Sequence, residues 1–292
     1  MAEKRRRRFG DRRDGRRIRS FGIMNRVGIY IMPNRTGASN YLTDSFDITN
    51  VEKFIHQKRE QGLKRLGVLH LILAGYVRAV SQRPGINRFI SGQEVYARND
   101  IQVMMTIKKE MSLNAEETCI KMYFDPASTV EDIYNQFEKQ LEEGRAEEET
   151  SFDNVAKIFN HIPGLLLKFA VFILKLMDYF DLLPKSLLHI SPFHGSMFIT
   201  SMGSLGIPPV YHHLYDLGNV PFFIAYGSKQ RRTVINHDGE PEMRKFVDFV
   251  FTCDERICDG HYYASALKLF KRYLKEPEML DVPPKRVVED ID

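Results

Sequence analysis

The amino-acid sequence predicts a single α+β domain, and three observations support this. Expected strands and helices follow one another without the strict alternation that builds a doubly wound parallel sheet. The 292 residues are 43% hydrophobic and 27% charged, a globular composition that excludes a wholly disordered chain. A chain of this length buries roughly three quarters of its unfolded surface, which is enough for one large core.

The first hundred residues predict two strands, two helices and a hairpin. Thr49 with Glu52 three residues later matches a capping box, which predicts a helix start at Thr49. Ser91-Gly92 supplies a turn between two short apolar runs. In order, we expect a short strand at 27–32, a strand at 41–48, a helix from Thr49 to about Glu60, a helix at 66–81 and a hairpin at 88–97.

The rest of the chain predicts five strands and further helices. The expected order is strands at 101–108 and 117–124, a helix at 130–144, helical residues at 152–188, strands at 196–201, 222–227 and 245–252, and a helix at 262–274. The segment 164–184 is the most apolar, but its two lysines and two aspartates make it too charged for a transmembrane span. We expect a packed or interface-burying helix there.

Charge is distributed unevenly along the chain. Residues 1–20, which we call the arm, hold ten Lys or Arg against three acidic residues, so +7 of charge precedes a body of −3 within the net +4. Such a block predicts a flexible basic arm that can attract an acidic partner, anionic lipid or nucleic acid. Phe9 is its one aromatic residue, so a platform for stacking bases is not expected. Residues 281–292, the tail, are acidic and Pro-rich.

Several familiar motifs are absent from the sequence. It has no P-loop, no G-x-G-x-x-G after a strand, no H-E-x-x-H and no G-x-S-x-G. Cys119, Cys253 and Cys258 lack zinc-type spacing, and three cysteines exclude a disulfide scaffold. We therefore expect no metal site. No apolar signal-peptide region follows the basic start, and we expect a cytoplasmic protein.

Three segments carry residues suited to chemistry. Thr252–Gly260 (TCDERICDG) joins an expected strand to an expected helix, where Glu255 can stand at a pocket mouth. The simpler interpretation is a charged turn in which Asp259 caps the helix. Phe198–Gly206 (FITSMGSLG) places hydroxyls among glycines, as an oxyanion site requires, although Ser/Gly loops are common. In Val210–Asp216 (VYHHLYD), His212 or His213 can serve as a base, or as a buried hydrogen-bonded histidine.

These segments, in this order, resemble a known family. The run Lys245–Leu280 is similar to the end of the acyltransferase catalytic domain of 2-oxoacid dehydrogenase complexes, where a strand precedes H-R-x-x-D-G and a helix. Chloramphenicol acetyltransferase shares that fold. Arg83–Phe89 (RPGINRF) resembles the family's P-x-x-N turn, and Met197–Gly206 resembles its F-T-I-S-x-L-G strand and loop. The resemblance covers most of residues 41–280.

The resemblance implies a two-layer fold with a mixed sheet and flanking helices. The domain would span 21–280 and carry an apolar helical insert at about 152–188. It also implies a coenzyme A thioester as co-substrate, a homotrimer with the site between subunits, and room for a larger assembly. A structural ion pair would join Asp259 to an arginine near the domain start, Arg26 or Arg35. No lipoyl attachment site is expected in this chain.

The family's site residues carry over with one departure. Its catalytic histidine falls on Glu255, while Asp259 and Gly260 are kept. The hydroxyl that stabilises the oxyanion falls on Thr200 or Ser201, and the expected cofactor-binding positions are Gly203, Ser204 and Gly260. Glutamate is a weaker base than histidine at its ordinary pKa of about 4.3, but burial can raise such a pKa to about 6–7. His212 or His213 can instead supply the base.

Two interpretations of the function remain open. The first is an acyltransferase that uses a coenzyme A thioester and a thiol, hydroxyl or amine acceptor. The second is a non-catalytic trimeric or cage-forming scaffold, or an acyl-CoA-binding protein, derived from the same fold. The missing histidine favours the second interpretation, and the retained Asp-Gly pair with the hydroxyl strand favours the first.

Overall fold

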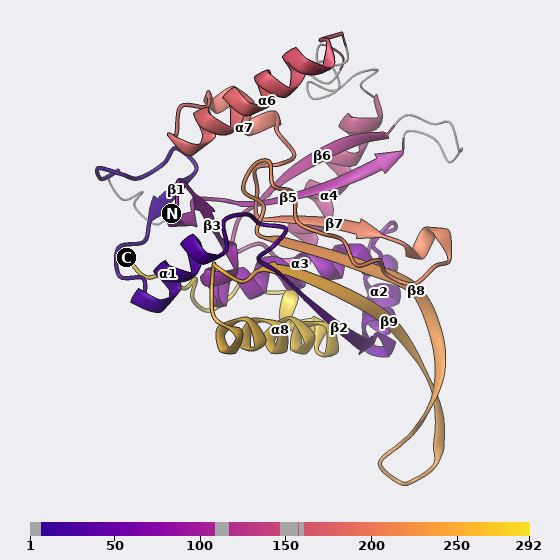
Figure 1. Ribbon diagram of the computed structural model, residues 1–292. Helices are drawn as coiled ribbons and strands as arrows, with labels where there is room; N and C mark the ends of the chain where they lie inside the picture. The colour runs from indigo at the N-terminus through magenta and orange to yellow at the C-terminus, as the bar shows by residue number, and fades with distance from the viewer. Residues whose placement is uncertain (1–6, 109–116, 147–156, 158–160) are drawn as a thin grey trace.

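A mixed six-stranded sheet forms the centre of the molecule (Figure 1). The computed structural model describes residues 7–108, 117–146, 157 and 161–292. The strand order is β2-β9-β8-β7-β5-β6, in which β7 runs parallel to both neighbours and the other pairs are antiparallel. The strands are β2 (Ser39–Asp47), β5 (Ile101–Lys108), β6 (Glu117–Phe124), β7 (Met197–Ser201), β8 (Phe222–Ile235) and β9 (Pro241–Asp254). The expected α+β class with flanking helices is confirmed.

Helices cover one face of this sheet, and a long loop covers part of the other. The covering helices are α2 (Thr49–Glu60), α3 (Val68–Gln82), α4 (Val130–Ala146) and α8 (Gly260–Lys275) (Figure 1). Tyr76 of α3 and Phe251 of β9 are 1% exposed in the core between them. On the opposite face, Leu214 and Val220 of the loop pack with Phe223 of β8 in a smaller apolar cluster. The fold thus has two layers.

Most of the expected elements are present, but two local expectations are wrong. Residues 23–31 form helix α1 (Ile23–Ile31) where a strand was expected at 27–32. The short apolar run from Val27 fits a strand as well as a helix. The helical spacing of apolar residues is visible only when the segment is followed from Ile23. The capping box at Thr49 is also not formed, because the N-cap is Ile48 and Glu52 pairs with Lys229 and Lys245.

The described part of the arm is packed, where a flexible basic segment was expected. Residues Gly15–Arg17 form β1, which extends a second, three-stranded sheet with β4 (Glu94–Arg98) and β3 (Arg88–Ser91). Ile18 is 1% exposed. Gly15 lies so close to the ring of Phe89 that a Cβ there would be 2.6 Å from it. Residues 1–6 lie outside the described residues.

The acidic tail contacts the arm directly. Arg16 donates from Nη1 to the carbonyl of Ile291 (2.8 Å) and from Nη2 to the carbonyl of Asp290 (2.8 Å). Arg8 pairs with Asp292 at 2.9 Å. Asp290 also forms a two-pronged ion pair with Arg88 of β3, and both side chains are nearly inaccessible, at 5% and 6% exposed. Charges that are separated in the sequence are therefore paired in space.

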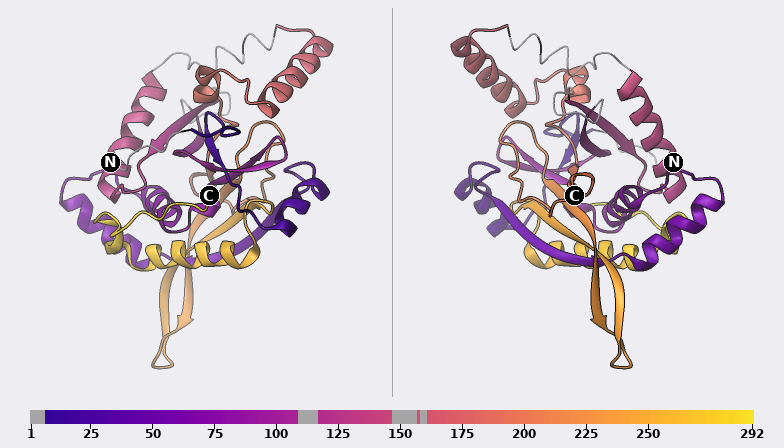
Figure 2. Two further views of the ribbon diagram at one scale, coloured as in Figure 1. Left: turned by 90° about the vertical axis from the view of Figure 1, so that its left-hand side faces the viewer. Right: turned by 90° about the vertical axis from the view of Figure 1, so that its right-hand side faces the viewer.

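The insert forms a helix that projects from the body of the protein and leaves its own apolar side chains exposed. The described residues give α6 (Gly164–Tyr179) and α7 (Lys185–Ile190), while 152–156 and 158–160 lie outside them. Leu165, Phe169 and Phe172 of α6 are 82%, 61% and 57% exposed. The helix extends away from the sheet (Figure 2), so its apolar face is not buried against the described part of the chain. Among the described residues no helix is long and apolar enough to span a membrane.

The last two strands are longer than expected and end in a projecting hairpin. Strands were expected at 222–227 and 245–252, whereas β8 and β9 pair as far as Ile235 and Pro241. The predicted turn at Asn236–Gly239 is confirmed, with the Gly239 amide donating to the Asn236 carbonyl at 3.1 Å. The outer part of this hairpin stands clear of the body (Figure 2).

Candidate functional site

A buried ion pair holds the turn that follows β9. The carboxylate of Asp254 accepts from Nε (2.8 Å) and Nη2 (2.7 Å) of Arg256, and both side chains are under 5% exposed. Arg256 also donates to the carbonyl of Met32 (2.9 Å), just after α1. Arg35 adds a second cation, with Nε 3.7 Å from Asp254. Glu255 lies between Asp254 and Arg256 and is exposed, so the buried pair fixes the backbone that presents its carboxylate.

Asp259 caps helix α8 and does not form the expected ion pair. Its Oδ1 accepts a hydrogen bond from the amide of Tyr262 at 2.8 Å, as in an ordinary N-cap. The arginine near the domain start is Arg35, but its aspartate partner is Asp254. Arg26 instead donates to the carbonyl of Arg19. Sequence analysis missed Asp254, although its place at a strand end two residues before an arginine was a usable signal.

The candidate oxyanion residues lie at the end of β7. Thr200 and Ser201 are half-buried, and Ser201 lies opposite Tyr226 of β8. Burial raises the pKa of Tyr226, and a hydrogen bond from the Ser201 side chain opposes that rise. Ser201 and the buried Tyr226 are therefore neighbours on adjacent strands.

The loop after Ser201 folds tightly over β8. Gly203 begins a short 3-10 turn (Gly203–Leu205), and a Cβ there would lie 3.1 Å from the carbonyl oxygen of Gly227. Ser204 is exposed. Gly206 has a φ of +72°, which favours glycine. Of the three expected cofactor-binding positions, Gly203 and Ser204 share this loop, whereas Gly260 begins α8 with open space around it.

The two adjacent histidines have different surroundings. The ring of His212 stacks on Phe223 of β8 at 4.1 Å between centroids, and its Nδ1 bonds with the carbonyl of His213 (2.7 Å). Burial lowers the pKa of His212, which favours its neutral form. Its carbonyl accepts from Thr252, three residues before Glu255 (2.7 Å). His213 is exposed, so His212 is the better placed of the two as a base.

Strand register keeps the two halves of the candidate site apart within one chain. Ser201 lies opposite Tyr226, which lies opposite Phe249 of β9. Glu255 follows six positions after Phe249, which is roughly 20 Å along the strand at about 3.3 Å per residue. Two strand spacings of about 4.8 Å separate β7 from β9 in addition. A single chain therefore cannot bring Glu255 and Ser201 to one substrate atom.

No metal centre accompanies these residues in the part of the chain that the structure describes. No group of three or more His, Cys, Asp or Glu side chains there could hold a metal ion. The groups that the turn and loop offer are a carboxylate, hydroxyls and a neutral imidazole. These are suited to proton transfer and to stabilising an oxyanion.

Comparison with known proteins defines the class of fold. A model of the catalytic domain of the 2-oxoacid dehydrogenase acyltransferases matches residues 180–282, which include β7, β8, β9 and α8. The resemblance expected from the sequence motifs is confirmed. No curated protein matches the chain.

Solved structures of acetyltransferases share the fold over nearly the whole chain. A dihydrolipoamide acetyltransferase from Azotobacter vinelandii has a TM-score of 0.59 and 13% identity, covering 93% of this chain and 95% of its own. A probable dihydrolipoamide acetyltransferase from Listeria monocytogenes has a TM-score of 0.58 and 13% identity, covering 87% and 90%. A chloramphenicol acetyltransferase has a TM-score of 0.50 and 13% identity, covering 87% and 92%. At such identities the likeness shows the fold alone.

Proposed function

We propose that this protein is an acyltransferase that moves an acyl group from a coenzyme A thioester to a thiol, hydroxyl or amine acceptor. The observation that carries the proposal is the turn Asp254–Gly260, which a buried ion pair holds in place and on which Glu255 is exposed. By the motif resemblance, Glu255 stands in place of the family's histidine. The Azotobacter structure was determined to study a serine, a histidine and, four residues after it, an asparagine in the catalytic mechanism. Glu255 and Asp259 have the same spacing.

In this mechanism, Glu255 acts as the general base. Its carboxylate takes the proton of the acceptor, and the acceptor atom attacks the thioester carbonyl carbon. Ser201 donates a hydrogen bond to the oxyanion that forms, with Thr200 as its neighbour on β7. The intermediate expels the coenzyme A thiolate, which takes the proton back from Glu255. His212, neutral and close to the same turn, is the alternative base.

The same proposal includes assembly of at least three copies. Glu255 and Ser201 are roughly 20 Å apart along the sheet within one chain, whereas a reacting pair must approach to about 3–3.5 Å. A neighbouring copy that brings its Ser201 to this chain's Glu255 resolves the separation. Closed cyclic symmetry then gives one complete site per interface. One structure of the same fold is described as the cubic core of a pyruvate dehydrogenase complex, so trimers of this chain have a precedent for a larger assembly.

Thermal unfolding with coenzyme A or acetyl-CoA tests the donor. A ligand at 100 times its Kd adds about 2.7 kcal/mol to the free energy of unfolding. We expect a saturable rise of several degrees in the midpoint. Turnover by Glu255→Gln should fall at least about 100-fold, the usual contribution of a general base. Glu240→Gln, an exposed change in the hairpin turn, is the matched control.

A non-catalytic scaffold is the second candidate function. Two observations favour it: glutamate in place of the family's histidine, and the exposed apolar face of α6. An absent midpoint shift at millimolar coenzyme A, together with a stable trimer, would establish this alternative over the acyltransferase. Full turnover by Glu255→Gln would instead remove Glu255 from the mechanism and assign the base to His212.

Binding of an acidic partner, anionic lipid or nucleic acid through residues 1–20 remains a separate proposal. Arg12 and Arg16 of this segment already have partners within the chain. Affinity for anionic vesicles or RNA should therefore be low and should fall with salt. Binding that is unaffected by removal of residues 1–8 would contradict a role for the basic residues at the start of the arm.

A further inference from the structure

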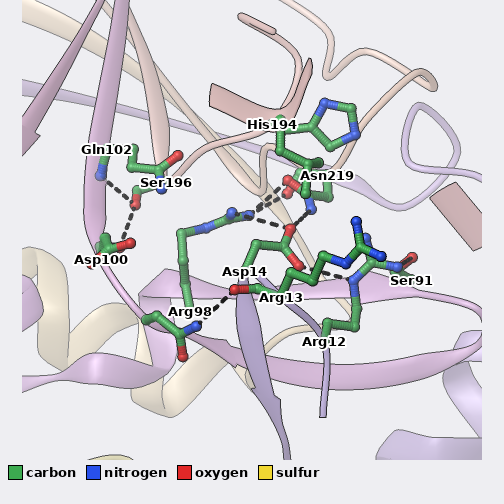
Figure 3. Close-up of polar contacts among 12 residues, drawn as sticks. Arg12, Arg13, Asp14, Ser91, Arg98, Asp100, Gln102, His194, Ser196 and Asn219 are labelled. Atoms are coloured by element: carbon green, nitrogen blue, oxygen red, sulfur yellow. Dashed lines mark hydrogen bonds and ion pairs between the residues drawn. The ribbon is translucent and has the colours of Figure 1, made fainter. Parts of the chain in front are cut away.

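A cavity of about 220 Å³ lies where the arm, the edge of the sheet and the end of the insert meet. Figure 3 shows most of the polar residues around it. The arm contributes Arg13 and Asp14, the sheet and its loops contribute Arg98, Asp100, Gln102 and Tyr123, and the segment from α7 to β7 contributes Lys185, Leu188, His189 and His194. At roughly 30 Å³ per water molecule the space corresponds to about seven waters, enough for a small ligand.

Arg98 is a buried cation in the wall of this cavity, and two of its donor atoms are unused and closed off from solvent. Its side chain is 1% exposed, and its Nη2 donates to the carbonyl (3.1 Å) and side-chain Oδ1 (2.8 Å) of Asn219 (Figure 3). Its Nε and Nη1 have no hydrogen-bond partner within the described residues. The guanidinium also lies over the ring of Phe89, 4.2 Å from the centroid, so it is held in place from one side. A buried charged donor left without an acceptor is costly.

The carboxylate of Asp14, close to Arg98, already accepts hydrogen bonds from other side chains. Asp14 accepts from Nε of Arg12 at 3.0 Å and from Nδ2 of Asn219 at 2.8 Å. Its distance from Nη1 of Arg98 is 3.9 Å, too long for a hydrogen bond. Arg98 therefore lacks a full counter-ion, and burial lowers its pKa to about 10.

A second basic group, the half-buried Lys121, lies beside the cavity. Nζ of Lys121 donates to the carbonyls of Leu188 (2.7 Å) and Ser191 (3.2 Å) and to no carboxylate. Burial, followed by repulsion from Arg98, lowers its pKa to about 7. Lys185 is exposed at the α7 side of the same cavity. The region thus has a buried and a half-buried basic group with too little negative charge around them.

We propose that this cavity binds a small oxyanion, the carboxylate or phosphate group of a metabolite, with Arg98 as its principal donor and Lys185 at its rim. Nη1 is closed off from solvent, so the side chains that cover it must shift before an acceptor can reach it. An acceptor that reaches Nη1 satisfies the unused donor and supplies the missing counter-charge. Arg98 offers the planar donor geometry that carboxylates and phosphates match. Asp14 and Asp100 also line the cavity, and their carboxylates repel an anion. A ligand must therefore place its negative charge next to Arg98.

This site is separate from the proposed catalytic residues. Gln102 lies level with Ser196, the residue just before β7, because the Ser196 amide donates to the Gln102 carbonyl at 2.8 Å. Ser201 is five positions further along, roughly 17 Å at about 3.3 Å per residue. β9, which leads to Glu255, is three strands away from β5 in the sheet order. The inference does not depend on acyl transfer.

Isothermal titration calorimetry with two probes tests the proposal on the full chain. Inorganic phosphate and succinate are titrated separately at constant ionic strength, so that general salt effects cancel and the two anion classes are compared. We expect saturable binding of at least one probe with one site per chain. Arg98→Lys should weaken that binding at least tenfold, because one ammonium replaces the forked guanidinium.

Lys185→Glu is the second variant, because Arg98→Lys changes a buried group and can impair folding. Lys185 is exposed, so its charge reversal leaves the fold intact and should weaken binding several-fold. Lys64→Glu, an exposed reversal on the turn between α2 and α3, is the matched control and should bind like the wild type. Absence of saturable binding of both probes, or equal affinities in Lys185→Glu and Lys64→Glu, would overturn the proposal.

Discussion

At the scale of single residues, the same aspartate can fill a catalytic motif and cap a helix. Asp259 was expected in both roles, and the structure gives it the N-cap of α8. The buried aspartate that pairs with arginine is Asp254, five residues earlier. A motif in the sequence therefore located the right turn but did not say which of its carboxylates is buried.

Asp259 should contribute to stability as a cap. Asp259→Ala removes the acceptor for the Tyr262 amide and should lower the free energy of unfolding by about 1 kcal/mol. Asp259→Asn should be nearly neutral, because asparagine caps as well as aspartate. Urea denaturation of both variants measures the difference. Equal losses in the two variants would mean that the charge, rather than the cap, matters.

Asp178 should make stability depend on pH in the acid range. Burial alone would raise its pKa, but His194 and Arg12 lower it to about 2. Against about 3.9 in the unfolded chain, this lowered pKa contributes about 2 kcal/mol above pH 4, which is lost as the pH falls toward 2. Asp178→Asn should be destabilised by about that amount at pH 7 and should match the wild type near pH 2. Asp181→Asn, a change at a more exposed carboxylate, is the control.

At the scale of elements, long patterns were predictable and short ones were not. The strands at 101–108 and 117–124 have the predicted bounds, because their apolar runs are long and bounded by polar residues. α1 was wrongly predicted as a strand, because the prediction rested on its last residues alone. Among the described residues, most of its apolar side chains are exposed. The buried ion pairs next to Glu255 join Asp254 to Arg256 and to Arg35. No local sequence pattern connects position 35 with the turn at 254–256.

The tail should be needed for full stability. Asp290 is the carboxylate partner of buried Arg88, so Asp290→Ala leaves an uncompensated buried charge. We expect a loss of about 3–5 kcal/mol, since breaking a buried pair costs more than the pair contributes. Glu289→Ala, the exposed neighbour, should have little effect. The double variant Arg88→Met with Asp290→Ala should recover part of the loss, and a failure to recover would show that Arg88 contributes mainly through other contacts.

At the scale of the whole molecule, the sequence predicted the architecture but not two features in which distant parts of the chain meet. These are the cavity around Arg98 and the contacts between the arm and the tail. The mixed sheet and its flanking helices followed from the motifs. The cavity around Arg98 could not be predicted, because it joins positions 13–14, 98–102 and 185–194 across the fold. The arm was expected to be flexible because its charges were counted without the tail that pairs with them.

Mixing two inactive variants tests whether the site is shared between copies. If Glu255 and Ser201 act from neighbouring subunits, Glu255→Gln and Ser201→Ala should each be nearly inactive alone. Subunits of both kinds, unfolded and refolded together in equal amounts, should regain roughly one quarter of the sites, because one interface in four combines two intact residues. Sedimentation velocity confirms the trimer. Mixed samples that stay inactive, or a monodisperse monomer, would contradict a shared site.

The pairing of arm and tail also determines when the fold can be completed during synthesis. Arg16 and Arg88 are synthesised well before their partners at positions 290–292. At about 5–20 residues per second, some 270 residues take roughly 15–50 s to make. During that interval β1 and β3 carry arginines without their acidic partners. The nascent chain is therefore more basic than the finished protein, and nascent-chain contacts with ribosomal RNA or chaperones would involve this end.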